Sequence, residues 1–163
     1  MKQTDNFKFD EANVMNELVY RNLSEDAKRQ ICAWKYGGEY DLYNLPSYEE
    51  MQVRQIGFMN PQREKNYYGF WDESILVGFV NILEEKEEIF IGIGVNPDLC
   101  NKHYGQRMLS ITYEISKKLY PNKPLYLEVR TWNIRAIKCY QKAGFRIDGQ
   151  AYELTTGIGT GTF

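Results

Sequence analysis

Apolar residues recur along this chain at two spacings, and each spacing predicts a different kind of element. Ala27 and Ile31 fall at helical spacing after Ser24, whose side chain is suited to cap a helix, and Gly37 is suited to end it. Ser47 can cap a second helix in the same way. The apolar periodicity and the breakers around it predict four helices, over residues 25–36, 48–59, 105–119 and 134–143.

Shorter runs rich in β-branched and aromatic residues predict strands. These runs cover residues 18–23, 66–71, 75–83, 89–95, 125–130 and 146–155. The second, third and fourth follow one another through short polar turns, which is typical of an antiparallel meander. This mixture of strands and helices predicts an α/β (α+β) fold in a single domain over residues 17–163. Residues 1–16 are polar and weakly patterned, and we expect them to form an N-terminal extension.

The size and net charge of the chain limit the kinds of partner that we expect for it. The 163 residues suffice for one hydrophobic core, and the net charge of −2 at pH 7 leaves no broad basic surface. We therefore expect no nucleic acid and no membrane as a partner, and a small substrate fits better. The longest strongly apolar run, residues 89–95, is far shorter than the roughly 20 residues of a membrane helix. The first residues lack the apolar region of a secretory signal, so we expect a cytoplasmic protein.

The cysteines predict neither a disulfide framework nor a metal site. Cys32, Cys100 and Cys139 are odd in number, form no CxxC pair and are accompanied by a single histidine. We expect three reduced thiols.

Two segments have a pattern that points to chemistry. The first, residues 91–109 (IGIGVNPDLCNKHYGQRML), predicts a strand, a loop and the start of a helix. The first turn of a helix leaves backbone N–H groups unpaired and carries partial positive charge, which suits a pyrophosphate. Gly105 lets the backbone approach a ligand closely, and Lys102 and Arg107 can add charge. A purely structural turn fits the same pattern.

The second segment, residues 127–145 (LEVRTWNIRAIKCYQKAGF), predicts a helix with a defined start and end. Asn133 stands at the N-cap position, and Tyr140 follows seven residues later on the same helical face, with Ala136 between them. Gly144 is suited to the left-handed position after the helix, where Phe145 can pack back on the last turn. An amphipathic helix whose Tyr140 is only a core residue is the alternative.

The pattern LxVxxxNxxAIxxYxxxGF in residues 127–145 resembles the signature of the GNAT superfamily of N-acetyltransferases at every position. Upstream, WxYxxxYxxYN in residues 34–44 resembles a bacterial subgroup of these enzymes. The resemblance covers roughly residues 17 to 156. It implies a mostly antiparallel mixed sheet with a splayed parallel pair, flanked by helices, and acetyl-CoA (coenzyme A) as the acetyl donor. Residues 102–107 occupy the place of the superfamily's Q/R-x-x-G-x-G/A pyrophosphate loop but keep only its first glycine, Gly105.

The resemblance also implies roles for individual residues. Tyr140 corresponds to the proposed acid for the leaving thiolate, and we expect it to hydrogen-bond the thiolate rather than complete a proton transfer. Glu128 resembles the strand glutamate that serves as general base in some relatives. Phe90 replaces the carboxylate that many relatives use instead, which leaves Glu84, Glu88 or an ordered water as further candidates.

Binding residues follow from the same resemblance. The cofactor-binding residues are expected to be Ile93, Gly94, Val95, Lys102, His103, Tyr104, Gly105, Gln106, Arg107, Met108, Asn133, Ala136 and Tyr140. The acceptor site is expected to be walled by Trp34, Tyr36, Tyr40 and Tyr43. Aromatic faces can hold a cationic amine, so the expected acceptor is a small amine or a peptide α-amine.

Two departures from the superfamily's pattern leave other outcomes open. The altered loop and Phe90 are also compatible with a non-catalytic domain that binds acyl-CoA as a sensor or an assembly module. The superfamily usually ends in two antiparallel strands, whereas this sequence stops at Phe163. A truncated last strand would leave an open sheet edge, so we expect a homodimer or a frayed C-terminus.

Overall fold

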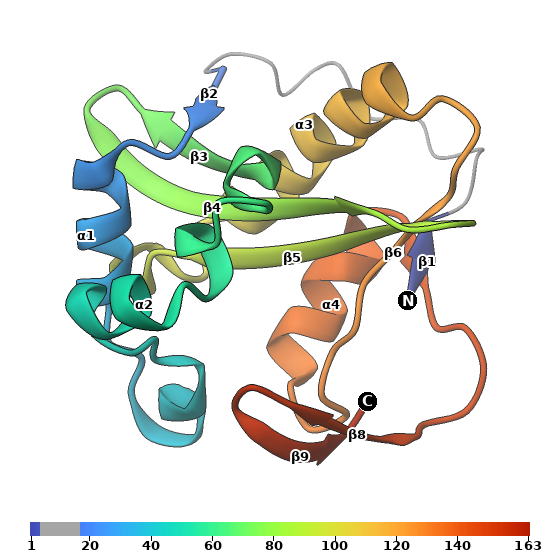
Figure 1. Ribbon diagram of the computed structural model, residues 1–163. Coiled ribbons are helices and arrows are strands. Elements are labelled where there is room, and N and C mark those ends of the chain that lie inside the picture. The colour runs from blue at the N-terminus through green and yellow to red at the C-terminus, as the bar shows by residue number, and fades with distance from the viewer. Residues whose placement is uncertain (4–16) are drawn as a thin grey trace.

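The computed structural model describes residues 1–3 and 17–163. Its centre is a seven-stranded sheet with the order β2-β3-β4-β5-β6-β1-β7 (Figure 1). The strands are β1 Lys2–Gln3, β2 Val19–Asn22, β3 Tyr67–Asp72, β4 Ile75–Glu84, β5 Ile89–Val95, β6 Leu125–Tyr126 and β7 Phe145–Arg146. Neighbouring strands are antiparallel except for β5 and β6, which are parallel. The predicted mixed, mostly antiparallel sheet with one parallel pair is confirmed.

In the described residues, four α-helices flank the sheet: α1 Glu25–Ala33, α2 Tyr48–Arg54, α3 Tyr104–Leu119 and α4 Ile134–Lys142. The two predicted serine caps are confirmed, because Ser24 accepts a hydrogen bond from the Ala27 N–H and Ser47 from the Glu50 N–H, each at 3.1 Å. Helix α2 ends five residues earlier than predicted, since Gln55 takes a left-handed backbone conformation with φ 51°. Short 3₁₀ helices are η2 Gly38–Tyr43, η3 Gly57–Met59, η4 Glu64–Asn66 and η5 Pro97–Leu99.

The sheet separates two hydrophobic cores. On one face, strand residues such as Val80 and Ile91 pack with Met108 of α3. On the other face, Ile31 of α1 and Met51 of α2 belong to the second core. Strand residues alternate between the faces because successive side chains of a strand point in opposite directions. This arrangement places α3 on one side of the sheet and α1 with α2 on the other.

Strands β5 and β6 diverge soon after they meet. They pair only through Ile89 with Leu125 and Phe90 with Tyr126. Residues 127–130, which we predicted as the second part of one strand, continue away from β5 without pairing to it. The result is a wedge-shaped opening between β5 and residues 127–130.

The first residues of the chain lie inside the sheet. Strand β1 runs between β6 and β7, the Met1 amine donates to the Leu127 carbonyl at 2.6 Å, and the Leu127 N–H donates to the Met1 carbonyl at 2.9 Å. We expected residues 1–16 to form an extension, and for Met1 to Gln3 this is wrong: two strand residues are too few to give a periodic pattern. Residues 4–16 of the expected extension lie outside the described residues.

The C-terminal part departs most from expectation. The long strand predicted over residues 146–155 is wrong, because β7 ends at Arg146 and Gly149 takes a left-handed turn with φ 80°. The chain then forms a separate hairpin of β8 Glu153–Thr156 and β9 Gly159–Thr162. Figure 1 shows this hairpin below α4, away from the sheet. The expected frayed C-terminus is wrong, because β9 pairs with β8 and Phe163 pairs with Tyr152. The expected homodimer stays a prediction.

Within the described part of the chain, no helix has both the length and the apolar character needed to cross a bilayer. The cytoplasmic location stays a prediction.

Candidate active site

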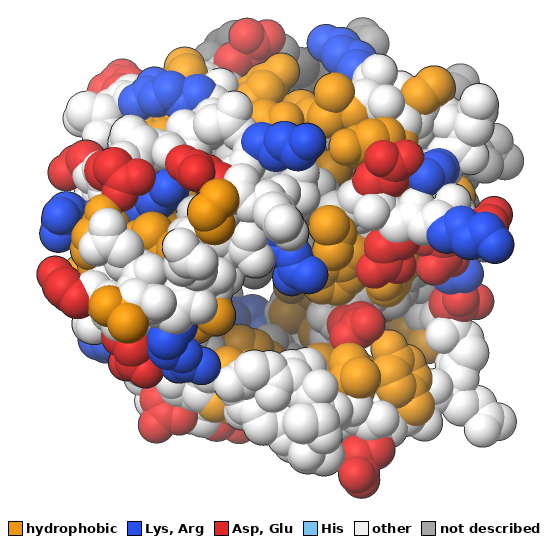
Figure 2. Space-filling view, viewed as in Figure 1, with side chains coloured by type: hydrophobic (Ala, Val, Ile, Leu, Met, Phe, Trp, Pro, Cys, Tyr) orange, Lys and Arg blue, Asp and Glu red, His pale blue; other side chains and the backbone are white. Residues whose placement is uncertain are grey.

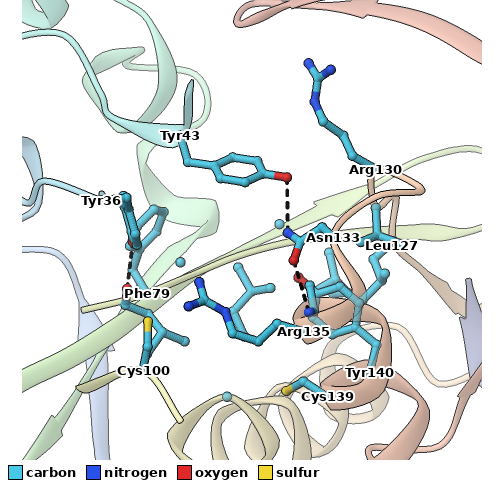
Figure 3. A pocket seen from close by; sticks show the side chains of 18 of the residues that line it. Tyr36, Tyr43, Phe79, Cys100, Leu127, Arg130, Asn133, Arg135, Cys139 and Tyr140 are labelled. Carbon is cyan, nitrogen blue, oxygen red and sulfur yellow. Dashed lines mark hydrogen bonds between the residues drawn. The ribbon is translucent and has the colours of Figure 1, made fainter. Parts of the chain in front are cut away.

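A cavity of about 770 Å³ lies in the opening between β5 and residues 127–130. The start of α3, one face of α4, the aromatic residues before α2 and the C-terminal hairpin also line it (Figure 3). Figure 2 shows the hollow on the surface, between the sheet and the hairpin. The segments that the sequence analysis singled out, residues 91–109 and 127–145, thus meet in one space.

Strand β5 offers the cavity a free backbone edge. Its residues up to Val95 pair with β4 on one side, whereas β6 covers the other side only at Ile89 and Phe90. Beyond Phe90, the backbone groups on that side therefore face the cavity instead of a strand. Gly94 is required here, because a Cβ atom at this position would lie 2.4 Å from the ring of Phe79.

Glu128 lies on the opposite wall. Glu128 lines the cavity together with its neighbours Leu127, Val129 and Arg130. Burial, together with the nearby Glu85 carboxylate, raises the pKa of Glu128, and the Met1 amine opposes this shift. The carboxyl group is therefore more basic than an ordinary glutamate.

The other candidate carboxylates are engaged at the surface. Glu84 pairs with Lys123 and Glu88 with Lys2, each at 2.6 Å, and neither lines the cavity. Phe90 lines it and packs on Tyr126, with ring centres 5.5 Å apart. Among the described residues that line the cavity, Glu128 alone has an acidic side chain.

The start of α3 is open toward the cavity. His103 precedes the helix in a left-handed conformation with φ 65°, and its side chain makes no capping hydrogen bond. The first backbone N–H groups of this 16-residue helix are therefore left without a side-chain cap. Gly105 lets α3 approach α4, because a Cβ atom there would lie 2.9 Å from the Cys139 sulfur.

The predicted cofactor residues around this helix fall into two groups. Those that line the cavity are Ile93, Gly94, Val95, His103, Tyr104, Gly105 and Gln106. Lys102, Arg107 and Met108 do not. Lys102 is exposed, the Arg107 guanidinium lies 5.3 Å from the ring of Tyr104, and Met108 is fully buried in the core. Helical geometry explains this for Arg107 and Met108, since α3 points only part of its surface at the cavity, whereas Lys102 lies in the loop before the helix.

Helix α4 begins with the predicted cap. The Asn133 side chain accepts a hydrogen bond from the Ala136 N–H at 3.2 Å and donates one to the Tyr43 hydroxyl, also at 3.2 Å (Figure 3). Asn133, Ala136 and Tyr140 all line the cavity. Burial, as the largest cause, raises the pKa of the Tyr140 phenol, so the phenol stays protonated at neutral pH.

Of the aromatic residues expected around the acceptor, Trp34, Tyr36 and Tyr43 line the cavity. The Tyr36 hydroxyl donates to the Val95 carbonyl at 2.6 Å and so ties the loop to the end of β5. Tyr40 does not line the cavity. Its ring lies 5.6 Å from that of Trp132, and the Arg135 guanidinium lies 4.0 Å from its centre.

The sequence analysis missed several basic residues of the cavity. On α4 these are Arg135, Lys138 and Lys142, and their spacing of three and four residues is a signal that could have identified them as one face. Arg130 and the hairpin residue Ile158 were also missed. No local pattern predicts that the hairpin folds back over residue 130, because that contact joins segments about 30 residues apart.

Comparison with known proteins identifies the family. The model of the acetyltransferase (GNAT) family matches residues 28–145, well over half of the chain. A probable spermine N(1)-acetyltransferase from Bacillus subtilis subsp. natto (strain BEST195) is 31% identical over 100 residues. The match covers 54% of this chain, and the chain spans 66% of that relative's length.

Solved structures have the same fold. Spermidine N-acetyltransferase from Vibrio cholerae, in complex with CoA and spermine, aligns with a TM-score of 0.70 at 17% identity over 90% of this chain and 92% of its own. A GNAT-family acetyltransferase from Bacillus anthracis gives 0.70 at 18% identity, with 90% of each chain covered. An aminoglycoside acetyltransferase in complex with coenzyme A gives 0.67 at 18% identity, over 89% of this chain and 91% of its own. The chain belongs to the acetyltransferase (GNAT) family.

Proposed function

We propose that this chain is an acetyl-CoA-dependent N-acetyltransferase that moves an acetyl group to a primary amine by direct attack on the thioester. The observation that carries the proposal is the cavity itself, which joins the free edge of β5, the uncapped start of α3 and Tyr140. The relatives with named reactions, on spermine, spermidine and aminoglycosides, acetylate amines, and several of their structures hold CoA or acetyl-CoA.

The described residues fit an acyl-CoA. The N–H groups at the start of α3 suit the pyrophosphate, since a helix N-terminus carries partial positive charge. Gly94 lets β5 pass beside Phe79 and Gly105 lets α3 approach α4, because a side chain at either position would collide with a neighbour. The N–H groups of Ile93 and Val95, on the side of β5 that β6 leaves uncovered, can donate to the acetyl carbonyl, as an oxyanion hole does. Bound acetyl-CoA would supply an activated acetyl group on a good leaving group.

Glu128 is the general base in this proposal. Primary amines are mostly protonated at pH 7, with pKa values of about 8 to 10.4, and only the neutral amine attacks. Because the pKa of Glu128 is raised, its carboxylate accepts a proton more readily than an exposed glutamate does. As the new N–C bond forms and the C–S bond breaks, the amine proton passes to Glu128, directly or through water.

Tyr140 acts as a hydrogen-bond donor to the departing sulfur. A phenol of pKa about 10 is already a weaker acid than a thiol of pKa about 8.5, and burial raises the pKa of Tyr140 further. Complete proton transfer to the thiolate is therefore uphill, by roughly 2 kcal/mol before the effect of burial. A hydrogen bond stabilises the developing negative charge without that transfer.

The acceptor amine enters beside Trp34 and Tyr43, whose rings line the cavity. Aromatic faces attract an ammonium group before it loses its proton. A small amine or a peptide α-amine fits this description.

The test is a turnover assay with acetyl-CoA and a panel of amines that includes spermine, an aminoglycoside, an amino acid and a short peptide. Release of free thiol with at least one amine is expected, and Tyr140→Phe is expected to lower kcat at least tenfold. The matched control is Tyr20→Phe, on the exposed edge strand β2, which should retain the wild-type rate. Tight CoA binding without turnover on any amine would instead support an acyl-CoA-binding module.

A further inference from the structure

Arg130 is a buried cation with no anionic partner among the described residues. It is 7 % exposed and lines the cavity. Its Nη1 and Nη2 atoms donate to the carbonyl oxygens of Thr160 and Gly159, each at 3.3 Å, and its guanidinium lies 5.1 Å from the centre of the Phe163 ring. Its Nε atom is buried and has no hydrogen-bond partner.

This environment leaves binding capacity unused. A guanidinium has five N–H donors, and two of them are engaged by backbone carbonyls. Burial of a charge is costly unless an opposite charge or a full set of hydrogen bonds compensates it. Two long hydrogen bonds and an aromatic ring compensate it only in part, whereas a carboxylate offers the planar pair of acceptors that suits a guanidinium best.

The C-terminal hairpin fixes the position of this guanidinium. Gly161 lies directly against the guanidinium, because a Cβ atom at this position would lie 1.8 Å from Nη1. The Thr131 N–H also donates to the Thr162 carbonyl at 2.9 Å and attaches the hairpin beside it. The site is therefore preorganised, which lowers the entropy that a ligand loses on binding.

Arg130 is separate from the basic residues of α4. Arg135, Lys138 and Lys142 lie on that helix, and the Arg135 guanidinium lies over the ring of Tyr40. Figure 3 shows the Arg130 side chain extending away from Tyr140 and Asn133. Arg130 follows Glu128 by two residues on an extended segment, so the two side chains leave the same face with roughly 7 Å between their Cα atoms.

We propose that Arg130 binds a carboxylate of the acceptor, so that the acceptor is an amino-acid-like molecule with both a primary amine and a carboxylate. This inference rests on the proposed function and names the substrate class of the same cavity. Glu128 receives the amine, and Arg130 holds the acid group. A polyamine is a poorer match, because it offers no acid group to Arg130 and would bring an ammonium group close to that guanidinium.

The experiment compares matched acceptors that differ only in the acid group: free amino acids against their carboxamides, with spermine alongside. For the wild type, kcat/KM is expected to be at least tenfold higher for the best free acid than for its amide, the usual effect of a hydrogen bond to a charged group. Arg130→Met should remove this preference by raising KM for the acid alone. Arg130→Lys keeps the positive charge but not the paired N–H donors of the guanidinium, so this variant should keep part of the preference for the acid. Arg146→Met, an exposed arginine outside the cavity, is the matched control.

Three results would overturn the inference. These are a wild type without preference for the acid, a wild type that prefers spermine, and an Arg130→Met variant that loses acid and amide turnover equally, as a purely structural arginine would. If Arg130→Met lacks a melting transition and so does not fold, the test rests on the other two proteins. The acid and the amide are then compared for the wild type and for Arg130→Lys.

Failure of the proposed function would look different, since no amine would release thiol. In that case calorimetry with N-acetyl amino acids and CoA tests Arg130 without turnover. Binding to the wild type that is at least tenfold weaker in Arg130→Met supports the carboxylate site. Absence of binding, or equal binding to both proteins, contradicts it.

Discussion

The two walls of the cavity, β5 and residues 127–130, present different chemical groups to it. Along β5 the wall is backbone, with glycine at 92 and 94 and a free strand edge. Along residues 127–130 the wall is side chains, with a carboxylate at 128 and a guanidinium at 130. The function of the β5 wall should therefore depend on the space around its backbone, so that it tolerates few added atoms. The function of the wall formed by residues 127–130 should depend on the charges of its side chains. Chemically different substitutions should accordingly break each wall.

The largest effect is expected from Gly94→Val. The new side chain would collide with Phe79, since its Cβ atom alone would lie 2.4 Å from that ring, and the strand edge must shift. A displacement of about 1 Å in a catalytic geometry can reduce the rate 100-fold, so kcat/KM should fall at least 100-fold. Overpacking of this kind also lowers the free energy of unfolding by about 1–3 kcal/mol, which thermal denaturation measures.

Gly92→Ala is the comparison for that variant. A Cβ atom at residue 92 would lie 3.5 Å from the Asn81 Cβ, an ordinary van der Waals contact. A few-fold change in kcat/KM at most is expected. If both variants lost a large and equal part of kcat/KM, the space around each glycine would not explain the losses.

On the other wall, Glu128→Gln should change the pH dependence as well as the rate. The base is active only above its pKa, which is raised, so the wild-type kcat/KM, expressed per neutral amine, should fall on acidification at a pH above the ordinary glutamate value of about 4.3. The variant should lose this acidic limb and at least tenfold in kcat. A variant with the wild-type profile would remove Glu128 from the mechanism.

The smallest effect concerns Asn133, which begins α4 just after the second wall. Asn133→Ala removes the cap of α4 and the hydrogen bond to Tyr43, which should lower the free energy of unfolding by about 1 kcal/mol and Tm by about 2–4 °C. Asn133→Ser keeps a capping oxygen and should recover most of this loss. If both variants melt like the wild type, the cap contributes nothing to stability.

Features that depend on neighbouring residues could be predicted from the sequence, whereas features that depend on long-range contacts could not. Caps such as Ser24 and Asn133, and strand β5 with its bounds, follow from local residue patterns and are confirmed. The side of the strand on which Glu128 lies could not be settled in advance, because it depends on where β6 leaves β5. Strand β1 between β6 and β7 and the fold-back of the hairpin onto Arg130 are long-range contacts of short segments, which no local pattern records.

The central claim is that acetyl-CoA lies along the backbone wall and the acceptor along the charged wall. A crystal structure with acetyl-CoA tests it most directly. We expect the pyrophosphate at the N–H groups that begin α3 and the acetyl carbonyl within hydrogen-bond distance of the β5 backbone near Gly94, with Tyr140 close to the sulfur. Density for the cofactor outside this cavity, or a thioester far from β5, would contradict the account.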